Sequence, residues 1–285
     1  MKLEDISKIA VIGAGTMGQG IAQICAMAGY EVVIYDLSEQ TLVTAEANIS
    51  TNLDKGIERG KVTQAEKIAS LERITFSGDE RSLVADVIIE AIIENLEVKK
   101  ALIANLEAIN SETTILASNT SSIPITRIAA GLKYPERFVG MHFFNPAHIM
   151  KLVEVISGVA TDDNVANTIA DLARKLGKTP VMAADAPGFI VNRVARHFYV
   201  EGLKVLEEGV SDVNGIDRLM ESSGFRMGPF RLMDLIGVDT NYSVTESMFN
   251  AFHQEAKFRP SRIQQQKVDA GHHGRKSGKG FYNYD

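Results

Sequence analysis

The sequence predicts an α/β protein in which a doubly wound, mostly parallel sheet with a helical insertion is followed by a smaller all-helical domain. Three observations support this fold class. Short apolar runs alternate with helical periodicity in the first part of the chain, a glycine-rich turn joins the first run to the first helix, and helical periodicity alone continues from Phe189 onward. We therefore expect one domain at residues 1–186 and a second at 187–285.

The expected strands are short apolar runs bounded by helix or turn signals. They lie at 8–13, 31–36, 87–93, 114–119, 137–144, 151–156 and 179–182. Ser38 and Asn95 are suitable N-caps for the helices that follow them, and Thr63 with Glu66 forms a capping-box pattern. Because two helical segments separate the second expected strand from the third, we interpret this stretch as a helical insertion.

Composition limits the possible classes of protein. The chain has 285 residues, of which 45% are hydrophobic and 23% charged, as is usual for a soluble globular protein. A net charge of -6 argues against a nucleic-acid partner. Only one cysteine is present, Cys25, and the adjacent His272 and His273 have poor geometry for a shared metal ion, so we expect no disulfide and no metal site. With no membrane-spanning run and no signal peptide apparent, we expect a cytoplasmic protein without a membrane partner.

The turn after the first expected strand carries the pattern GxGxxG. It consists of Gly13, Ala14, Gly15, Thr16, Met17 and Gly18. The turn follows a strand, opens a helix and precedes Asp36 at the end of the next strand, which is the context of a Rossmann-type dinucleotide site. A carboxylate at Asp36 suits ribose hydroxyls and repels a 2′-phosphate, which favours NAD over NADP. The alternative is a glycine-rich turn without a ligand.

Seven stretches, spread over nearly the whole chain, resemble the L-3-hydroxyacyl-CoA dehydrogenase family, including its bacterial 3-hydroxybutyryl-CoA dehydrogenases. They are VIGAGTMGQGIA, EAIIENLEVKK, ILASNTSS, GMHFFNPAHIMKLVEVI, APGFIVNR, GPFRLMDLIGVD and GRKSGKGFY. The resemblance implies an NAD-dependent enzyme of fatty acid metabolism that interconverts (S)-3-hydroxyacyl-CoA and 3-oxoacyl-CoA of short chain length. It also implies a helical domain that serves substrate binding and forms a homodimer.

The same resemblance assigns roles to individual residues. His142 matches the catalytic acid/base and Glu154 its partner, while Ser121 and Asn192 match residues that contact the substrate. The positions matched to the cofactor are the glycine turn (Gly13, Gly15, Thr16, Met17 and Gly18), Asp36, Glu94, Lys99, Asn145 and Lys276. Lys55 falls where the family's basic residues meet the phosphates of coenzyme A.

The chemistry of alcohol oxidation explains why these residue types are needed. A base must take the hydroxyl proton while NAD takes the hydride, and histidine titrates near neutral pH. A carboxylate on the far ring nitrogen fixes the tautomer. His142 and Glu154 lie on consecutive expected strands, which would allow contact. Structural alternatives are a core histidine, a solvent-facing Glu154, a helix N-cap at Ser121, a backbone partner at Asn192 and a solvated Lys55.

Three functional alternatives stay open. Arginines in the helical domain would suit the far carboxylate of a 3-hydroxyadipyl-CoA substrate, or would instead form ion pairs. They are Arg193, Arg196, Arg226 and Arg231. A hydroxyacid or sugar-acid dehydrogenase is a second alternative, although those enzymes typically use a lysine as acid/base. A non-catalytic NAD-binding protein is the third.

Overall fold

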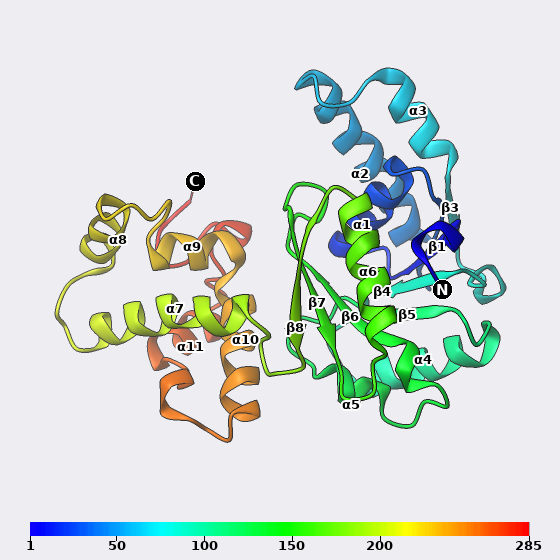
Figure 1. The fold of residues 1–285 in the computed structure, drawn as a ribbon. Coiled ribbons are helices and arrows are strands. Elements are labelled where there is room, and N and C mark those ends of the chain that lie inside the picture. Colours follow the sequence, from blue (N-terminus) through cyan, green and yellow to red (C-terminus); the bar gives the residue numbers. More distant parts are fainter. Residues whose placement is uncertain (285) are drawn as a thin grey trace. The chain divides into compact units, whose positions relative to one another are not determined.

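In the computed structural model, which describes residues 1–284, the chain divides into two compact units. The first unit is Met1–Ala186 and the second is Pro187–Asp285. The first contains the sheet and its covering helices, and the second is built from helices (Figure 1). The expected fold class is confirmed.

The first unit is built on one eight-stranded sheet with the order β3-β2-β1-β4-β5-β6-β7-β8. The strands are β1 (Lys8–Ile12), β2 (Glu31–Tyr35), β3 (Ile74–Ser77), β4 (Val87–Glu90), β5 (Ile115–Ser118), β6 (Phe138–Phe143), β7 (Leu152–Ser157) and β8 (Thr179–Ala184). Every neighbouring pair is parallel except β6 and β7, which are antiparallel. The chain runs outward in one direction from β1 and in the other from β4, so the topological switch point lies between these two strands.

Six α-helices belong to this unit and cover both faces of the sheet (Figure 1). They are α1 (Thr16–Met27), α2 (Glu39–Glu58), α3 (Gln64–Glu72), α4 (Leu96–Ile109), α5 (Ile125–Ala129) and α6 (Asp163–Lys175). The expected caps form: Ser38 caps α2, Asn95 caps α4, and Thr63 with Glu66 makes a reciprocal capping box at α3. Because helices lie on both faces, the central strands are apolar throughout instead of alternating, as in β4, where all four residues are buried.

One strand was missing from the sequence-based assignment. β3 follows α3 almost directly and pairs with β2 through Val32 and Ile74. The helices α2 and α3 therefore connect β2 to β3, and they run as a pair past the sheet in Figure 1, joined by the 2.6 Å ion pair of Lys67 with Asp54. As a four-residue strand at the edge of the sheet, β3 is only partly buried and has no long apolar run to identify it.

The second unit packs its helices around a small core. These helices are α7 (Val191–Glu207), α8 (Val213–Ser222), α9 (Pro229–Ile236), α10 (Val238–Ala251) and α11 (Arg262–Asp269). Tyr199, Leu203, Ile216, Phe230 and Met233 form the buried apolar cluster. No helix among residues 1–284 combines the length and the apolar character needed to cross a membrane.

Two buried aspartates attach the end of the chain to this helical unit. Asp217 accepts hydrogen bonds from the backbone of Phe230 and from the Tyr282 hydroxyl, at 2.9 and 2.7 Å. Asp234 accepts from the backbone N–H groups of Phe281 and Tyr282, both at 2.9 Å. These bonds satisfy carboxylates that would otherwise be costly to bury, and they fix the backbone at Phe281 and Tyr282.

Candidate active site

The glycine turn has the geometry that a close approach to phosphate requires. Gly13 has a φ of +97°, and a Cβ there would lie 2.7 Å from the carbonyl oxygen of Ala91. A Cβ on Gly18 would lie 1.7 Å from the carbonyl oxygen of Gly13, so only glycine fits. Gly15 has open space around it and is the N-cap of α1, which begins with Thr16 and Met17. Backbone N–H groups at this helix end are thus accessible to an anion.

Asp36 lies beside this turn, where its carboxylate accepts hydrogen bonds from the backbone N–H groups of Ala14 at 2.9 Å and Ser38 at 3.0 Å. A cavity of about 430 Å³ adjoins it. Its walls include Tyr35, Ile92, Ile93, Val98 and Leu102. Apolar walls next to a carboxylate suit an adenine ring and its ribose, so these residues fit the nucleotide half of NAD.

His142 and Glu154 form a buried hydrogen-bonded pair. They lie directly opposite each other in the antiparallel register of β6 and β7. The Nδ1 atom of His142 lies 2.8 Å from Oε2 of Glu154, and the two residues are only 5% and 1% exposed. Directly opposed strand residues have their Cβ atoms about 5 Å apart, which explains the contact. A carboxylate at Nδ1 orients the ring and stabilises its protonated form.

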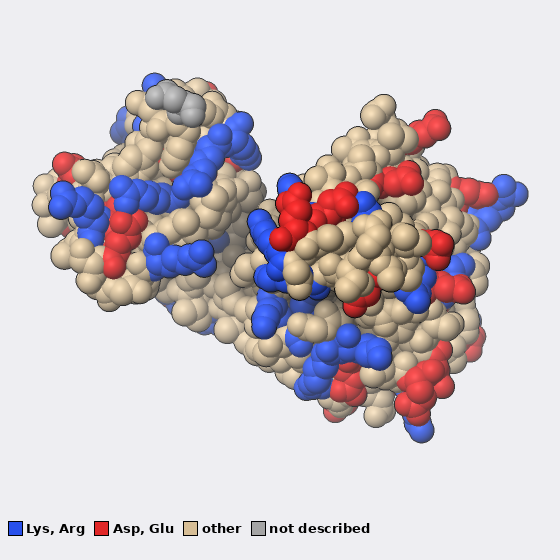
Figure 2. Space-filling model, turned by 90° about the horizontal axis from the view of Figure 1, so that it is seen from above, with Lys and Arg blue, Asp and Glu red and all other residues tan. Residues whose placement is uncertain are grey.

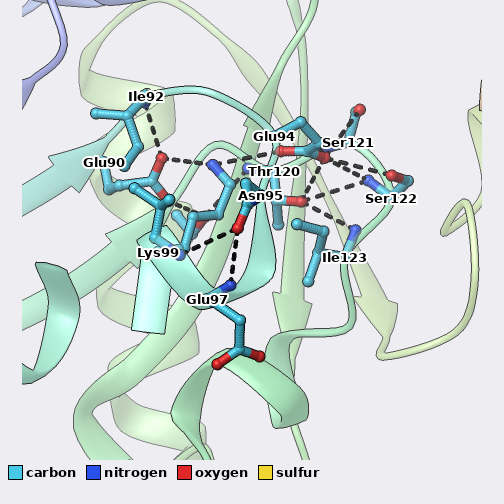
Figure 3. Close-up of polar contacts among 12 residues, drawn as sticks. Glu90, Ile92, Glu94, Asn95, Glu97, Lys99, Thr120, Ser121, Ser122 and Ile123 are labelled. Carbon is cyan, nitrogen blue, oxygen red and sulfur yellow. Dashed lines mark hydrogen bonds and ion pairs between the residues drawn. The ribbon is translucent and has the colours of Figure 1, made fainter. Parts of the chain in front are cut away.

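Ser121 lies in the turn that follows β5, and Glu94 organises this turn (Figure 3). One oxygen of Glu94 accepts hydrogen bonds from the Thr120 hydroxyl at 2.7 Å and from the backbone N–H groups of Ser121 and Ser122 at 2.9 and 3.2 Å. Burial acts to raise the pKa of Glu94, but Lys99 and these hydrogen bonds together hold it below its ordinary value. Glu94 is therefore a carboxylate that fixes the backbone carrying Ser121.

Lys99 is buried beneath this turn, with 1% of its surface exposed. Its ammonium group lies between two carboxylates, 2.5 Å from Glu90 and 3.3 Å from Glu94, as Figure 3 shows. The resemblance assigned Lys99 to the cofactor, whereas its contacts among the described residues are with these carboxylates. Glu90 and Thr120 were not identified from the sequence. The one available signal was a glutamate at the carboxyl end of an apolar strand run, where ligands bind in doubly wound sheets.

The Ser121 turn does not cap a helix. The next helix, α5, begins at Ile125 with Pro124 as its N-cap. The structural alternative of a helix N-cap at Ser121 is therefore wrong.

The loop after β6 carries Asn145, which is exposed. The next part of this loop is fixed by Lys178, whose ammonium group donates hydrogen bonds to the carbonyl oxygens of Ala147 and Met150 at 2.5 and 2.8 Å. Burial lowers the pKa of Lys178. No sequence pattern predicted a lysine in this structural role.

The remaining expected residues lie in other parts of the molecule. Lys55 is exposed on α2, close enough that, after burial and Lys178, it contributes to lowering the pKa of His148. Asn192 is the second residue of α7, and Lys276 makes a 2.7 Å ion pair with Asp239. Asn192 and Lys276 belong to the second unit, and the other expected site residues belong to the first.

The four candidate arginines of the second unit differ in their surroundings. Arg196 is buried, and its guanidinium donates to the carbonyl oxygen of Asn241 at 3.0 Å. Arg231 pairs with Glu221 at 2.7 Å. Arg193 and Arg226 are exposed. The Arg193 guanidinium lies over the Phe252 ring, 5.0 Å from its centroid, so three of the four make contacts within their own unit.

The surface drawn in Figure 2 carries groups of Lys and Arg beside Asp and Glu.

Within residues 1–284 there is no cluster of three or more His, Cys, Asp or Glu side chains that could hold a metal ion. Cys25 is buried in α1, and burial raises its pKa to about 12.

A doubly wound sheet, a glycine turn at its switch point and a buried histidine–carboxylate pair define a nucleotide-linked oxidoreductase of the Rossmann type. Residues 8–186 match the NAD binding domain of 3-hydroxyacyl-CoA dehydrogenase, and residues 188–284 match the C-terminal domain of that family. The chain belongs to the 3-hydroxyacyl-CoA dehydrogenase family. The match confirms the expected cofactor, NAD.

Individual relatives agree with this family. A 3-hydroxyadipyl-CoA dehydrogenase of Escherichia coli K12 is 48% identical over 98% of this chain, which spans 59% of that relative's length. A probable 3-hydroxybutyryl-CoA dehydrogenase of Deinococcus radiodurans is 42% identical, covering 97% of this chain and 100% of the relative. The crystal structure of an (S)-3-hydroxybutyryl-CoA dehydrogenase from Ralstonia eutropha superposes with a TM-score of 0.94 at 40% identity, covering 98% of this chain and 99% of the other.

Proposed function

We propose that this protein interconverts (S)-3-hydroxyacyl-CoA and 3-oxoacyl-CoA with NAD, acting on short acyl chains such as 3-hydroxybutyryl-CoA and acetoacetyl-CoA. The observation that carries the proposal is the 2.8 Å contact between His142 and Glu154, buried in a chain of this family. The short acyl chain is supported by relatives that match over nearly their whole sequence, since their names specify 3-hydroxybutyryl-CoA.

In the oxidative direction, His142 takes the proton of the 3-hydroxyl group through its Nε2 atom. Glu154, bonded at Nδ1, stabilises the imidazolium that forms, and His142 later releases the proton to water. NAD, held by the glycine turn and Asp36, would supply the acceptor for the hydride of C3. In the reductive direction, the protonated His142 supplies the proton to the 3-oxygen.

The other residues bind and orient. Gly13, Gly15 and Gly18, with Thr16 and Met17, hold the pyrophosphate, and Asp36 binds the adenosine ribose. The resemblance supports Ser121 and Asn192 as contacts to substrate oxygens and Lys55 as a contact to a coenzyme A phosphate. It also supports Glu94, Lys99, Asn145 and Lys276 at the cofactor, where the buried Lys99 acts by fixing Glu94.

The roles of the two domains are part of the same proposal. Residues 1–186 bind NAD, and 187–285 serve substrate binding and dimerisation. A cytoplasmic homodimer is the expected form. Light scattering on an eluting size-exclusion peak measures this directly, and a monomer at micromolar concentration would contradict the dimer.

A second candidate substrate is 3-hydroxyadipyl-CoA. It is favoured by the name of the 48% identical relative from Escherichia coli. Arg193 and Arg226, being exposed, are the arginines able to meet a distal carboxylate. A sugar-acid dehydrogenase and a non-catalytic protein are disfavoured by membership of this family.

Steady-state oxidation of NADH with acetoacetyl-CoA and with 3-oxoadipyl-CoA tests these alternatives. A higher kcat/KM for acetoacetyl-CoA supports the short-chain proposal. A clear preference for 3-oxoadipyl-CoA that is lost in Arg193→Ala or Arg226→Ala would replace it with the second candidate. Activity with neither thioester would refute the proposed function.

A further inference from the structure

A buried carboxylate with no role assigned so far lies at the carboxyl end of β4. Glu90 is the last residue of this strand and is fully buried. In the parallel register it lies beside Ile12 of β1 and Ser118 of β5. Its position is therefore the switch point of the sheet, directly under the edge where dinucleotides bind in this fold.

Three donors occupy the two oxygens of Glu90. Oε1 accepts from the ammonium group of Lys99 at 2.5 Å and from the backbone N–H of Ile92 at 2.8 Å. Oε2 accepts from the Ser118 hydroxyl at 2.6 Å. Such complete pairing offsets the cost of burying a charge, and it sets the position of every donor in turn.

These contacts continue to the Ser121 turn along two routes (Figure 3). Through Lys99, Glu90 fixes the ammonium group that pairs with Oε2 of Glu94, whose Oε1 then accepts the backbone N–H of Ser121. Through Ser118, it fixes a hydroxyl oxygen that accepts the backbone N–H of Thr120 at 3.2 Å. The two routes meet at consecutive residues of one turn.

Charge explains why the first route needs Glu90. The ammonium group of Lys99 pairs with both Glu90 and Oε2 of Glu94, so its charge is divided between two carboxylates. Oε1 of Glu94 then accepts hydrogen bonds from the turn. If Glu90 were neutral, the full charge of the buried Lys99 would act on Glu94. The Glu94 carboxylate would then move toward Lys99 and weaken its hydrogen bonds to the turn.

We propose that Glu90 is a positioning residue of this enzyme, which holds Ser121 in place for the acyl thioester through Lys99 and Glu94 and through Ser118. The inference rests on the proposed function, because it takes Ser121 as a contact to the substrate. The side-chain contacts of Glu90 among the described residues are with Lys99, Ile92 and Ser118, so it acts on the turn through its neighbours.

The test is a double-mutant cycle between Glu90→Gln and Ser121→Ala, with kcat and KM measured for acetoacetyl-CoA reduction. Glu90→Gln keeps the size of the side chain and removes its charge. We expect kcat/KM to fall roughly tenfold, as for a misplaced hydrogen bond, and to fall less than twofold when Glu90→Gln is added to Ser121→Ala. Coupling of this kind is not produced by a general loss of stability.

A control residue lies just before the amino end of β4, away from Glu90. This residue, Asp86, accepts hydrogen bonds from the backbone N–H groups of Ser7 and Lys8, at 2.8 and 2.9 Å. Asp86→Asn removes a partly buried carboxylate that also holds backbone N–H groups, and it should lower the melting temperature while leaving kcat/KM within twofold.

If Glu90→Gln does not fold, Ser118→Ala replaces it in the cycle, since it removes the second route and leaves the charge of Glu90 in place. Additive effects in the cycle, or an unchanged kcat/KM in the folded single variant, would overturn the positioning role alone. An unaltered protein that is inactive with acyl thioesters would instead overturn the proposed function and this inference with it.

Discussion

Two clusters of ionisable side chains lie at the sheet, and they differ in how they are held. The first is the pair of His142 with Glu154, formed by two residues in direct register on antiparallel strands. The second, which we call the Glu90 cluster, consists of Glu90, Lys99 and Glu94 and joins a strand end, a helix and a loop. The pair in strand register contains His142, the group that changes charge in the proposed reaction. The Glu90 cluster contains charges that we expect to stay fixed. Proton transfer and positioning are thus separated into different clusters.

The largest difference between the clusters should appear on removing the proton carrier. We expect His142→Gln to lower kcat by roughly 10³-fold, because general acid–base catalysis contributes on this order. The affinity for NADH, followed by its own fluorescence, should stay within about twofold, since Asp36 and the glycine turn are unchanged. Near-normal turnover would show that His142 is not the acid/base.

The Glu90 cluster should respond to the loss of its cation mainly in stability. Lys99→Met leaves the buried Glu90 and the nearby Glu94 without the ammonium group between them, which should reduce the free energy of unfolding by roughly 3 kcal/mol. Lys178→Met is the control, because that lysine is also buried but, among residues 1–284, its hydrogen bonds go to uncharged carbonyl oxygens. Urea unfolding measures both variants. A loss at Lys99 no larger than the loss at Lys178 would mean that the cluster is not held by charge.

The family resemblance paired the two residues of the first cluster, whereas it named Glu94 and Lys99 of the second only as positions at the cofactor and did not name Glu90. His142 and Glu154 stand on two consecutive strands, and because a short connection favours pairing of such strands, the order of elements allowed their contact. The caps at Ser38, Thr63 and Asn95 were likewise predictable, because a cap depends on residues within one turn.

The burial of Lys99 depends on how α4 is placed over the end of β4, which no local pattern encodes. Lysine is almost never fully buried unless it is paired, and its partner Glu90 was hidden in an apolar run. The short edge strand β3 was missed for a related reason, since it is defined by its pairing with β2 more than by its own four residues.

Glu154 should matter less than His142, because it stabilises the charge without carrying the proton. For Glu154→Gln, which keeps an oxygen able to accept from Nδ1, we expect kcat to fall roughly 30-fold, less than the roughly 10²-fold or more that removal of an acid/base costs. The double variant with His142→Gln should be no slower than His142→Gln alone, since residues that act as a unit are not additive. A further loss in the double variant would show that His142 and Glu154 act independently, and the first cluster could then not be described as one unit.

The smallest expected effect is a pH dependence of stability in the Glu90 cluster. The pKa of Glu94 is held below its ordinary value of 4.5, against the effect of burial, by Lys99 and the hydrogen bonds of the Ser121 turn. A lowered pKa in the folded state means that the stabilisation is fully present above the ordinary value and is lost as pH falls through the lowered one. Glu94→Gln lacks this contribution at every pH. Its melting temperature should therefore lie below that of the unaltered protein at pH 7, and the gap should close as the pH is lowered below about 4.5.

Asp36→Asn serves as a control for this last prediction, since it neutralises a carboxylate next to the glycine turn, outside the Glu90 cluster. Differential scanning calorimetry from pH 7 downward supplies the comparison. A gap between Glu94→Gln and the unaltered protein that stays constant with pH would mean that Glu94 acts through its shape and hydrogen bonds alone. Closure of the gap would show instead that its charge, set by Lys99, is what holds the turn. A fixed charge of this kind distinguishes the Glu90 cluster from the pair of His142 and Glu154, in which we propose that a proton moves.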